Sequence, residues 1–176
     1  WLAEHAESIG GNSTKIAVGG GSAGGNLAAA LALHSRDTGG PEITFQFLFV
    51  PATDLSDTDK WDSFKQMGDK YMLKASDIKI IIDTYVARSE DRLSPYASPL
   101  RADSLEGLPP AFIVTAQYDP LRDQGEAYAE ALMSAGVEVD LIRRDGTIHG
   151  FAGSTKKMEQ IYKSLSVKLK TVFKGQ

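Results

Sequence analysis

The feature that most constrains the fold of this chain is a cluster of glycines with one serine inside it. A short run of β-branched and apolar residues, 16–18, enters the cluster at Gly19, and an alanine- and leucine-rich run leaves it after Ser22. This order predicts a strand, a tight turn and a helix, with Ser22 at the tip of the turn. Small residues are required at so sharp a turn, because the strand and the helix approach each other closely.

Residues 20–24 fit the pattern G-x-S-x-G, a nucleophile elbow that exposes the serine hydroxyl at a strand-to-helix turn. The first N–H groups of the following helix would then face a negative charge that develops beside the serine. Glycines 19, 21 and 24 also fit G-x-G-x-x-G, a dinucleotide-binding fingerprint. A third interpretation is a turn whose glycines only allow close helix–strand packing, whereas the flanking strand and helix disfavour a flexible linker.

The composition limits the kinds of protein that this chain can be. Its 176 residues, 42% of them hydrophobic and 24% charged, are enough for one globular domain with a core. A net charge of −4 disfavours a nucleic-acid or anionic-membrane partner. The absence of cysteine excludes disulfides, thiolate metal sites and a cysteine nucleophile. No apolar run approaches the length of a membrane span and no signal peptide is visible, so we expect a soluble cytoplasmic protein.

The rest of the chain predicts an open parallel α/β sheet flanked by helices, in one domain over residues 1–176. The near-continuous apolar runs at 43–50 and 111–116 are typical of strands covered on both faces, and the weaker run at 137–142 suits an edge strand. A loop containing His149 is expected over 145–153. Helices are expected at 23–35, from about 121 to 135, and at 155–173. An irregular insertion occupies about 54–108. Within it, Ser76 and Asp77 are expected to cap a helix that carries Ile78, Ile81, Ile82 and Tyr85.

Three polar residues follow predicted strands at the edge where such sheets bind ligands, the carboxyl ends of the strands. Ser22 follows the first strand, Asp119 the third and His149 the fourth. The order Ser, Asp, His differs from the two familiar protease orders. A dinucleotide site instead requires an acidic residue at the end of the second strand, where residues 49–52 contain none, so we disfavour that interpretation.

Several motifs give the chain a family resemblance. Residues 20–26 are similar to the motif GDSAGGN, and 51–54 to a strand-end P-x-T-D. Residues 118–123 resemble a D-P-L-R-D box around a catalytic acid, and 148–151 an H-G-F box around a catalytic histidine. In this order, the motifs resemble those of the hormone-sensitive-lipase-like carboxylesterases of the α/β-hydrolase superfamily. The resemblance runs from the first residue to the C-terminal helix, which implies the C-terminal half of such a fold.

The resemblance implies a serine carboxylesterase that acts on short-chain acyl esters through an acyl-enzyme. Ser22 would attack the ester carbonyl, His149 would take its proton and pass it to the leaving alcohol, and Asp119 would orient the imidazole. The N–H of Ala23 would be one oxyanion donor. The substrate would be a small-molecule ester, with no metal or organic cofactor. An amidase or deacetylase with the same triad, and a catalytically weak ligand-binding relative, remain open alternatives.

Aromatic and methionine side chains are the candidates for lining an acyl or alcohol pocket. Phe151 is the first choice because it is close to His149 in the sequence, and Gly21 is a further candidate because it precedes Ser22. The other candidates are Trp61, Phe64 and Met72. His5 and His34 lie on predicted helices and are expected to be surface or packing residues.

The family's H-G-G-G oxyanion motif precedes the elbow and has no counterpart in this sequence. Loss of a single oxyanion donor lowers the rate about 10²- to 10³-fold. The predicted strand 16–18 would also present a bare apolar edge. We therefore expect an N-terminal segment or a second chain to complete the sheet; association of identical chains is also compatible with the sequence.

Gly21 stands where the family usually has Asp or Glu. Glycine loosens a strained turn, and its presence removes a carboxylate near the site. We predict that Gly21→Asp raises the turnover of an ester substrate, measured by steady-state hydrolysis. Equal or lower turnover would contradict the idea that this glycine is a deficit.

Overall fold

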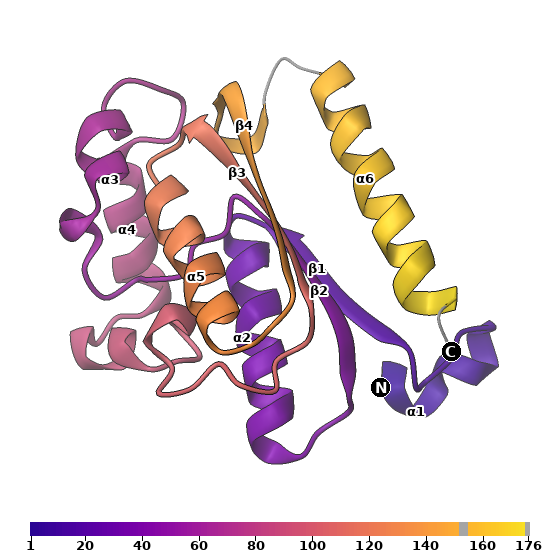
Figure 1. The fold of residues 1–176 in the computed structure, drawn as a ribbon. Coiled ribbons are helices and arrows are strands. Elements are labelled where there is room, and N and C mark those ends of the chain that lie inside the picture. The colour runs from indigo at the N-terminus through magenta and orange to yellow at the C-terminus, as the bar shows by residue number, and fades with distance from the viewer. Residues whose placement is uncertain (152–154, 175–176) are drawn as a thin grey trace.

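The computed structural model describes residues 1–151 and 155–174, which contain a four-stranded sheet (Figure 1). The strands are β1 (Ile16–Gly21), β2 (Ile43–Phe49), β3 (Ala111–Tyr118) and β4 (Val139–Ile148). They lie in the order β1-β2-β3-β4, and each neighbouring pair is parallel. The prediction of an open parallel sheet is therefore confirmed, and all the strands end at one edge.

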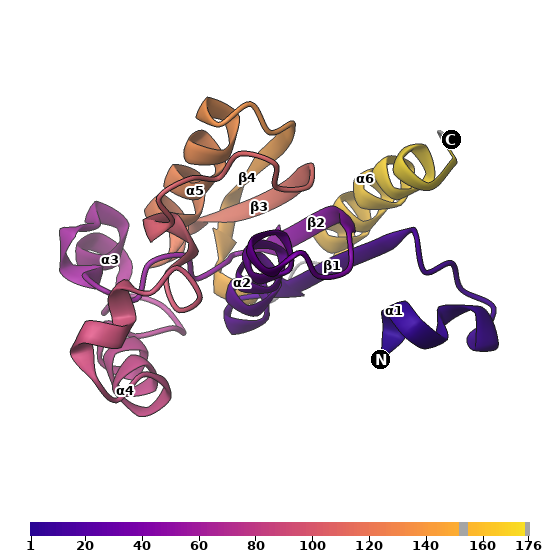
Figure 2. The same cartoon turned by 90° about the horizontal axis from the view of Figure 1, so that it is seen from below.

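Helices cover both faces of this sheet. Helices α2 (Ala23–Thr38) and α5 (Arg122–Ser134) lie on one face, and α6 (Thr155–Lys174) lies on the other (Figures 1 and 2). The short N-terminal helix α1 (Leu2–His5) continues into a 3₁₀ turn. Within the described residues, no helix is both long enough and apolar enough to cross a bilayer.

The segment that the sequence marks as irregular contains two further helices. They are α3 (Asp62–Met67) and α4 (Ala75–Tyr85), and both lie beyond α5 on the side away from α6 (Figures 1 and 2). Short 3₁₀ helices occur at Ala6–Ile9, Thr58–Lys60, Ser89–Leu93, Pro99–Arg101 and His149–Phe151. A small apolar cluster joins α3 and α4 to Leu121 at the start of α5.

The alanines of α2 let this helix pack closely on the sheet. Ala29, Ala32 and Leu33 are almost completely buried against β2, β3 and α5. In contrast, Leu27 and Leu31 of the same helix are 55% and 50% exposed, so its small side chains, and not its exposed leucines, form the buried face. On the other side of the sheet, α6 is packed through an apolar stripe that includes Ile161 and Leu165.

The last strand is longer than the sequence predicts. We expected a strand at 137–142 and a loop from 145, but β4 continues to Ile148. The pairing with β3 extends across an irregularity to a final pair between Tyr118 and Ile148. Arg143 and Asp145 of β4 are exposed at the sheet edge, and these charged residues interrupt the apolar pattern that signals a strand. As a consequence, His149 directly follows the end of the strand.

We predict that Leu33→Ala lowers the free energy of unfolding by about 2–5 kcal/mol, because it leaves a cavity between α2 and the sheet. The matched control is Leu31→Ala in the same helix, at a half-exposed position. Its effect should stay within about 0.5 kcal/mol. Urea unfolding followed by circular dichroism measures both, and equal effects would contradict this account of the α2 packing.

Candidate active site

Ser22 lies at the turn between β1 and α2 in a strained backbone conformation. Its φ of 56° and ψ of −118° fall in a region that residues with a side chain rarely adopt. The turn is held by the Ser22 N–H, which donates to the carbonyl of Phe49 at 2.8 Å. A Cβ on Gly20 would lie 2.5 Å from the backbone of Gly24, so only glycine fits at position 20. Because β1 and α2 approach each other so closely, the turn between them places the Ser22 hydroxyl at the carboxyl ends of the strands.

The structure brings Ser22, His149 and Asp119 together from the ends of three strands. The Nε2 atom of His149 lies 2.9 Å from the Ser22 hydroxyl oxygen, and its Nδ1 lies 2.8 Å from a carboxylate oxygen of Asp119. A carboxylate only accepts, so Nδ1 carries the hydrogen and Nε2 is free to accept from the hydroxyl. This is the arrangement that activates a serine as a nucleophile.

Asp119 is held in place by burial and by the backbone. It is fully buried, and its second carboxylate oxygen accepts the N–H of Leu121 at 2.8 Å. The nearby side chains of Ser63 and Asp123 exchange hydrogen bonds with each other's backbone N–H groups, and the Ser63 hydroxyl also donates to Pro120. These contacts fix the loop that carries Asp119. Asp123, in the first turn of α5, thus helps to hold this loop through its hydrogen bonds with Ser63.

Ala23 is the first residue of α2, so its N–H has no acceptor within the helix. It adjoins Ser22, at the positive end of the helix dipole, where a developing anion is stabilised. At Gly21, an added Cβ would have ordinary contacts, the nearest at 3.7 Å to the carbonyl of Phe49. A side chain therefore fits at position 21.

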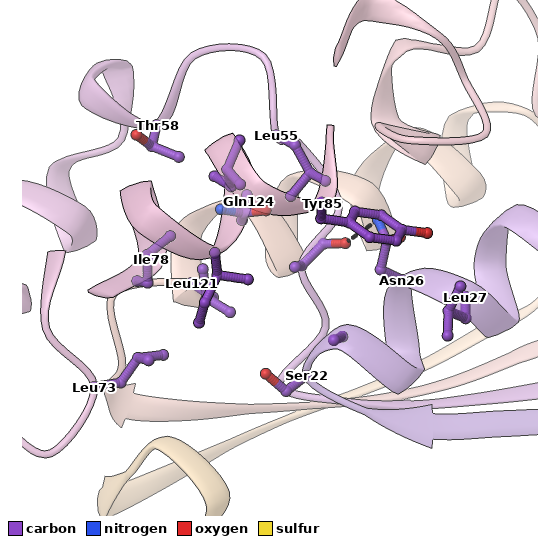
Figure 3. A pocket seen from close by; sticks show the side chains of 14 residues that line it. Ser22, Asn26, Leu27, Leu55, Thr58, Leu73, Ile78, Tyr85, Leu121 and Gln124 are labelled. Carbon is purple, nitrogen blue, oxygen red and sulfur yellow. Dashed lines mark hydrogen bonds between the residues drawn. The ribbon is translucent and has the colours of Figure 1, made fainter. Parts of the chain in front are cut away.

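An apolar cavity of about 200 Å³ opens beside Ser22 (Figure 3). Its wall is built from the first turn of α2, the segment after β2, α4 and the start of α5. The lining residues are Ser22, Ala23, Asn26, Leu27, Ala52, Leu55, Thr58, Leu73, Ile78, Ile81, Ile82, Tyr85, Leu121 and Gln124. Such a surface binds the hydrocarbon part of a small molecule.

Three of the aromatic and methionine candidates from the sequence, Trp61, Phe64 and Met72, do not line this cavity. Phe64 is buried in the cluster between α3, α4 and Leu121, and Trp61 packs against that cluster. Met72 is 62% exposed. The side chain of Phe151 lies outside the described part of the structure, so its predicted pocket contact stays a prediction.

The main pocket wall that the sequence interpretation missed is helix α4. Ile78 and Ile82 are buried, whereas Ile81 and Tyr85 are more than half exposed although they line the cavity. The available signal was an excess of apolar residues for a short helix in a polar insertion. Apolar side chains on more than one face of a helix indicate contacts beyond a single core.

Asp54 anchors the segment that follows β2. Its buried carboxylate pairs with Lys60 at 2.8 Å and with Arg101 at 3.0 Å, and it also accepts from Ser56. Burial by itself raises the pKa of Asp54, but the hydrogen bonds from Lys60, Ser56 and Arg101 bring that pKa below its usual value. This carboxylate is therefore a charged anchor. Among the described residues, no group of three or more His, Asp or Glu side chains is arranged to hold a metal ion.

Comparisons with known proteins agree with this fold. A family described as alpha/beta hydrolase fold matches residues 1–153. The carboxylesterase NlhH of Mycobacterium tuberculosis is 43% identical over 157 residues, which cover 86% of this chain and 48% of NlhH. An arylesterase of Saccharolobus solfataricus is 40% identical over 178 residues, covering 99% of this chain and 56% of the arylesterase.

A comparison with solved structures also finds esterases with the same fold. The crystal structure of a thermostable esterase from Pseudomonas putida superposes with a TM-score of 0.92 at 39% sequence identity. That superposition covers 97% of this chain and 55% of the esterase chain. The chain therefore spans about half the length of the curated relatives that it matches.

The close packing at the elbow generates a stability prediction. Gly20→Ala should lower the free energy of unfolding by about 1–3 kcal/mol, because the new methyl group overlaps the backbone of Gly24. Gly24→Ala is the control, since an added Cβ there meets nothing within 4 Å. It should be neutral or stabilising by up to about 1 kcal/mol, as is usual for alanine in a helix. Thermal unfolding tests the pair, and an equal loss in both variants would contradict the packing.

Proposed function

Since the chain belongs to the alpha/beta hydrolase family, and to its hormone-sensitive-lipase-like carboxylesterase branch, we propose that it hydrolyses short-chain carboxylic esters. One observation carries this proposal: the hydrogen-bonded series from Asp119 through His149 to Ser22, beside an apolar cavity. The esterase names of the relatives support the same reaction class.

In the first half of the proposed reaction, the Ser22 oxygen attacks the ester carbonyl while its proton moves to Nε2 of His149. The carboxylate of Asp119 stabilises the imidazolium that forms. The N–H of Ala23 donates to the carbonyl oxygen as that oxygen becomes negative. His149 then gives the proton to the departing alkoxide, which leaves an alcohol and an ester bond between Ser22 and the acyl group.

In the second half, water replaces the alcohol. His149 takes a proton from the water, the resulting hydroxide attacks the acyl carbon, and the same proton returns to the Ser22 oxygen as the acid leaves. Both halves use Nε2 of His149, because Nδ1 is hydrogen-bonded to Asp119 and only Nε2 faces the Ser22 oxygen. Of the described residues, these steps use the side chains of Ser22, His149 and Asp119 and the N–H of Ala23, together with water.

The cavity supports a small substrate. A volume of about 200 Å³ lies below the roughly 300–1,000 Å³ typical of drug-sized ligand pockets. Its lining is mainly aliphatic, so the group that fills it is a short hydrocarbon chain on the acyl or the alcohol side of the ester.

We also propose that additional polypeptide pairs with the free edge of β1. Within the described residues, β1 pairs with β2 alone, so the outer edge of this strand has unpaired backbone groups. A segment of the same protein, or a second chain, would cover that edge and could supply further donors to the oxyanion.

A phosphonate ester with a p-nitrophenolate leaving group tests the proposed nucleophile. We predict one adduct per chain by intact-mass spectrometry, formed when the Ser22 oxygen bonds to phosphorus and p-nitrophenolate departs. Ser22→Ala should form no adduct. An unlabelled protein that is folded by circular dichroism would contradict the proposed nucleophile. Hydrolysis of p-nitrophenyl acetate, compared with the matching anilide, distinguishes an esterase from an amidase.

A further inference from the structure

Residues 50–54, the segment directly after β2, lie between the two helices that begin beside Ser22 and Asp119. Pro51 packs against the first turns of both helices. A Cβ on Gly25 of α2 would lie 2.9 Å from Pro51, and one on Gly125 of α5 would lie 3.4 Å from the same ring. Both helices therefore present a glycine to one proline, and the spacing between their first turns is set by that contact.

Side chains from the two helices also bind this segment from opposite sides. From α2, the Nδ2 group of Asn26 donates to the carbonyl of Ala52 at 2.8 Å. From α5, the Oε1 atom of Gln124 accepts the N–H groups of Thr53 at 2.7 Å and of Asp54 at 2.8 Å. The Thr53 hydroxyl donates to the backbone carbonyl of Gln124 at 2.7 Å.

The side chains that make these hydrogen bonds are buried. Asn26 is 3% exposed, and Thr53 and Gln124 are fully buried. Two backbone donors face the Gln124 Oε1 atom, so the amide cannot be turned over without placing its NH₂ group against other N–H groups. Removing the acceptor would leave two buried donors unsatisfied, which costs about 1–3 kcal/mol for each group.

The backbone of the segment is itself strained. Val50, a buried β-branched residue, has a φ of 42°, in the left-handed region that such residues avoid. Its N–H donates to the carbonyl of Val114 in β3 at 2.7 Å. A strained conformation persists only where surrounding contacts determine it, which indicates that the position of this segment is tightly fixed.

The position of the segment matters because one imidazole ring must reach both helix starts. His149 bonds to Ser22 at 2.9 Å and to Asp119 at 2.8 Å. A relative shift of about 1 Å between Ser22 and Asp119 takes one of these contacts out of hydrogen-bond range. The contacts of the 50–54 segment connect the two helices by a path that does not pass through His149.

We propose that Asn26 and Gln124 are positioning residues that hold the 50–54 segment as a spacer between the nucleophile and the acid. This inference rests on the proposed esterase function. The two side chains act through backbone groups of the spacer and not on the ester itself. Their contribution is to keep the distance from Ser22 to Asp119 matched to the width of one imidazole.

Gln124→Leu removes the acceptor while keeping a similar volume. We expect the kcat for p-nitrophenyl acetate and the rate constant of Ser22 phosphonylation to fall together, by about 10- to 100-fold, because the triad is misplaced. KM should change much less, since the defect lies in the reacting geometry. Gln124→Glu should recover most of the rate, because a carboxylate also accepts both N–H groups.

The matched control is Gln46→Leu. Gln46 is an equally buried glutamine in β2, but its side chain donates to Pro109, and it pairs with Ala111 at the opposite end of β3 from Asp119. This variant should lose stability while keeping both rates. If Gln46→Leu slows phosphonylation as much as Gln124→Leu does, the loss is a general consequence of destabilisation and the spacer role is wrong.

Thr53→Val is the second test, because Thr53 does not line the cavity whereas Gln124 does. A decrease in the phosphonylation rate constant of this variant, smaller than the decrease in Gln124→Leu, supports the spacer role. Such a decrease cannot come from a change in the cavity lining. Unchanged rates in both Thr53→Val and Gln124→Leu would overturn the inference but leave the proposed function intact. Absence of phosphonylation in the unmodified protein would instead overturn the proposed function, and the spacer role with it.

Discussion

The close approach of α2 to β1 at Ser22 is the constraint on which the rest of the structure depends. Gly20 lies against Gly24 so tightly that no side chain fits between strand and helix. The turn therefore ends with the Ser22 hydroxyl at the carboxyl edge of the sheet. Because the strands are parallel, β3 and β4 end at the same edge and bring Asp119 and His149 to that hydroxyl.

The region around the site is also a place where several helices begin, and this explains its polar side chains. A helix start leaves backbone N–H groups without partners, and nearby turns add more of them. Asp119 accepts the N–H of Leu121, Asp123 accepts that of Ser63, and Gln124 accepts two N–H groups of the segment after β2. Acidic and amide groups are thus used here as fixed acceptors, which gives the apolar cavity a rigid polar frame.

The sequence predicted the features that local patterns encode. The glycines around Ser22 require a tight turn, and continuous apolar runs require covered strands, so the fold and the placement of Ser22, Asp119 and His149 could be inferred. The extent of β4 could not be inferred, because its exposed polar residues are held by pairing with β3 and not by burial.

The pocket wall was also missed, since the contribution of α4 depends on how a distant segment folds back over α2 and α5. The sequence predicted Ser76 as a helix cap, whereas α4 begins at Ala75 after Lys74 and has no side-chain cap hydrogen bond.

The positive φ of Ser22 has a consequence for the evolution of this chain. A conformation that suits glycine better than serine costs about 1–3 kcal/mol, a sizeable share of the 5–15 kcal/mol that keeps a typical domain folded. Substitutions that relax this turn would therefore make the protein more robust to heat while withdrawing the hydroxyl. At this one residue, fold stability and the proposed reactivity of the hydroxyl therefore place opposite demands on the backbone.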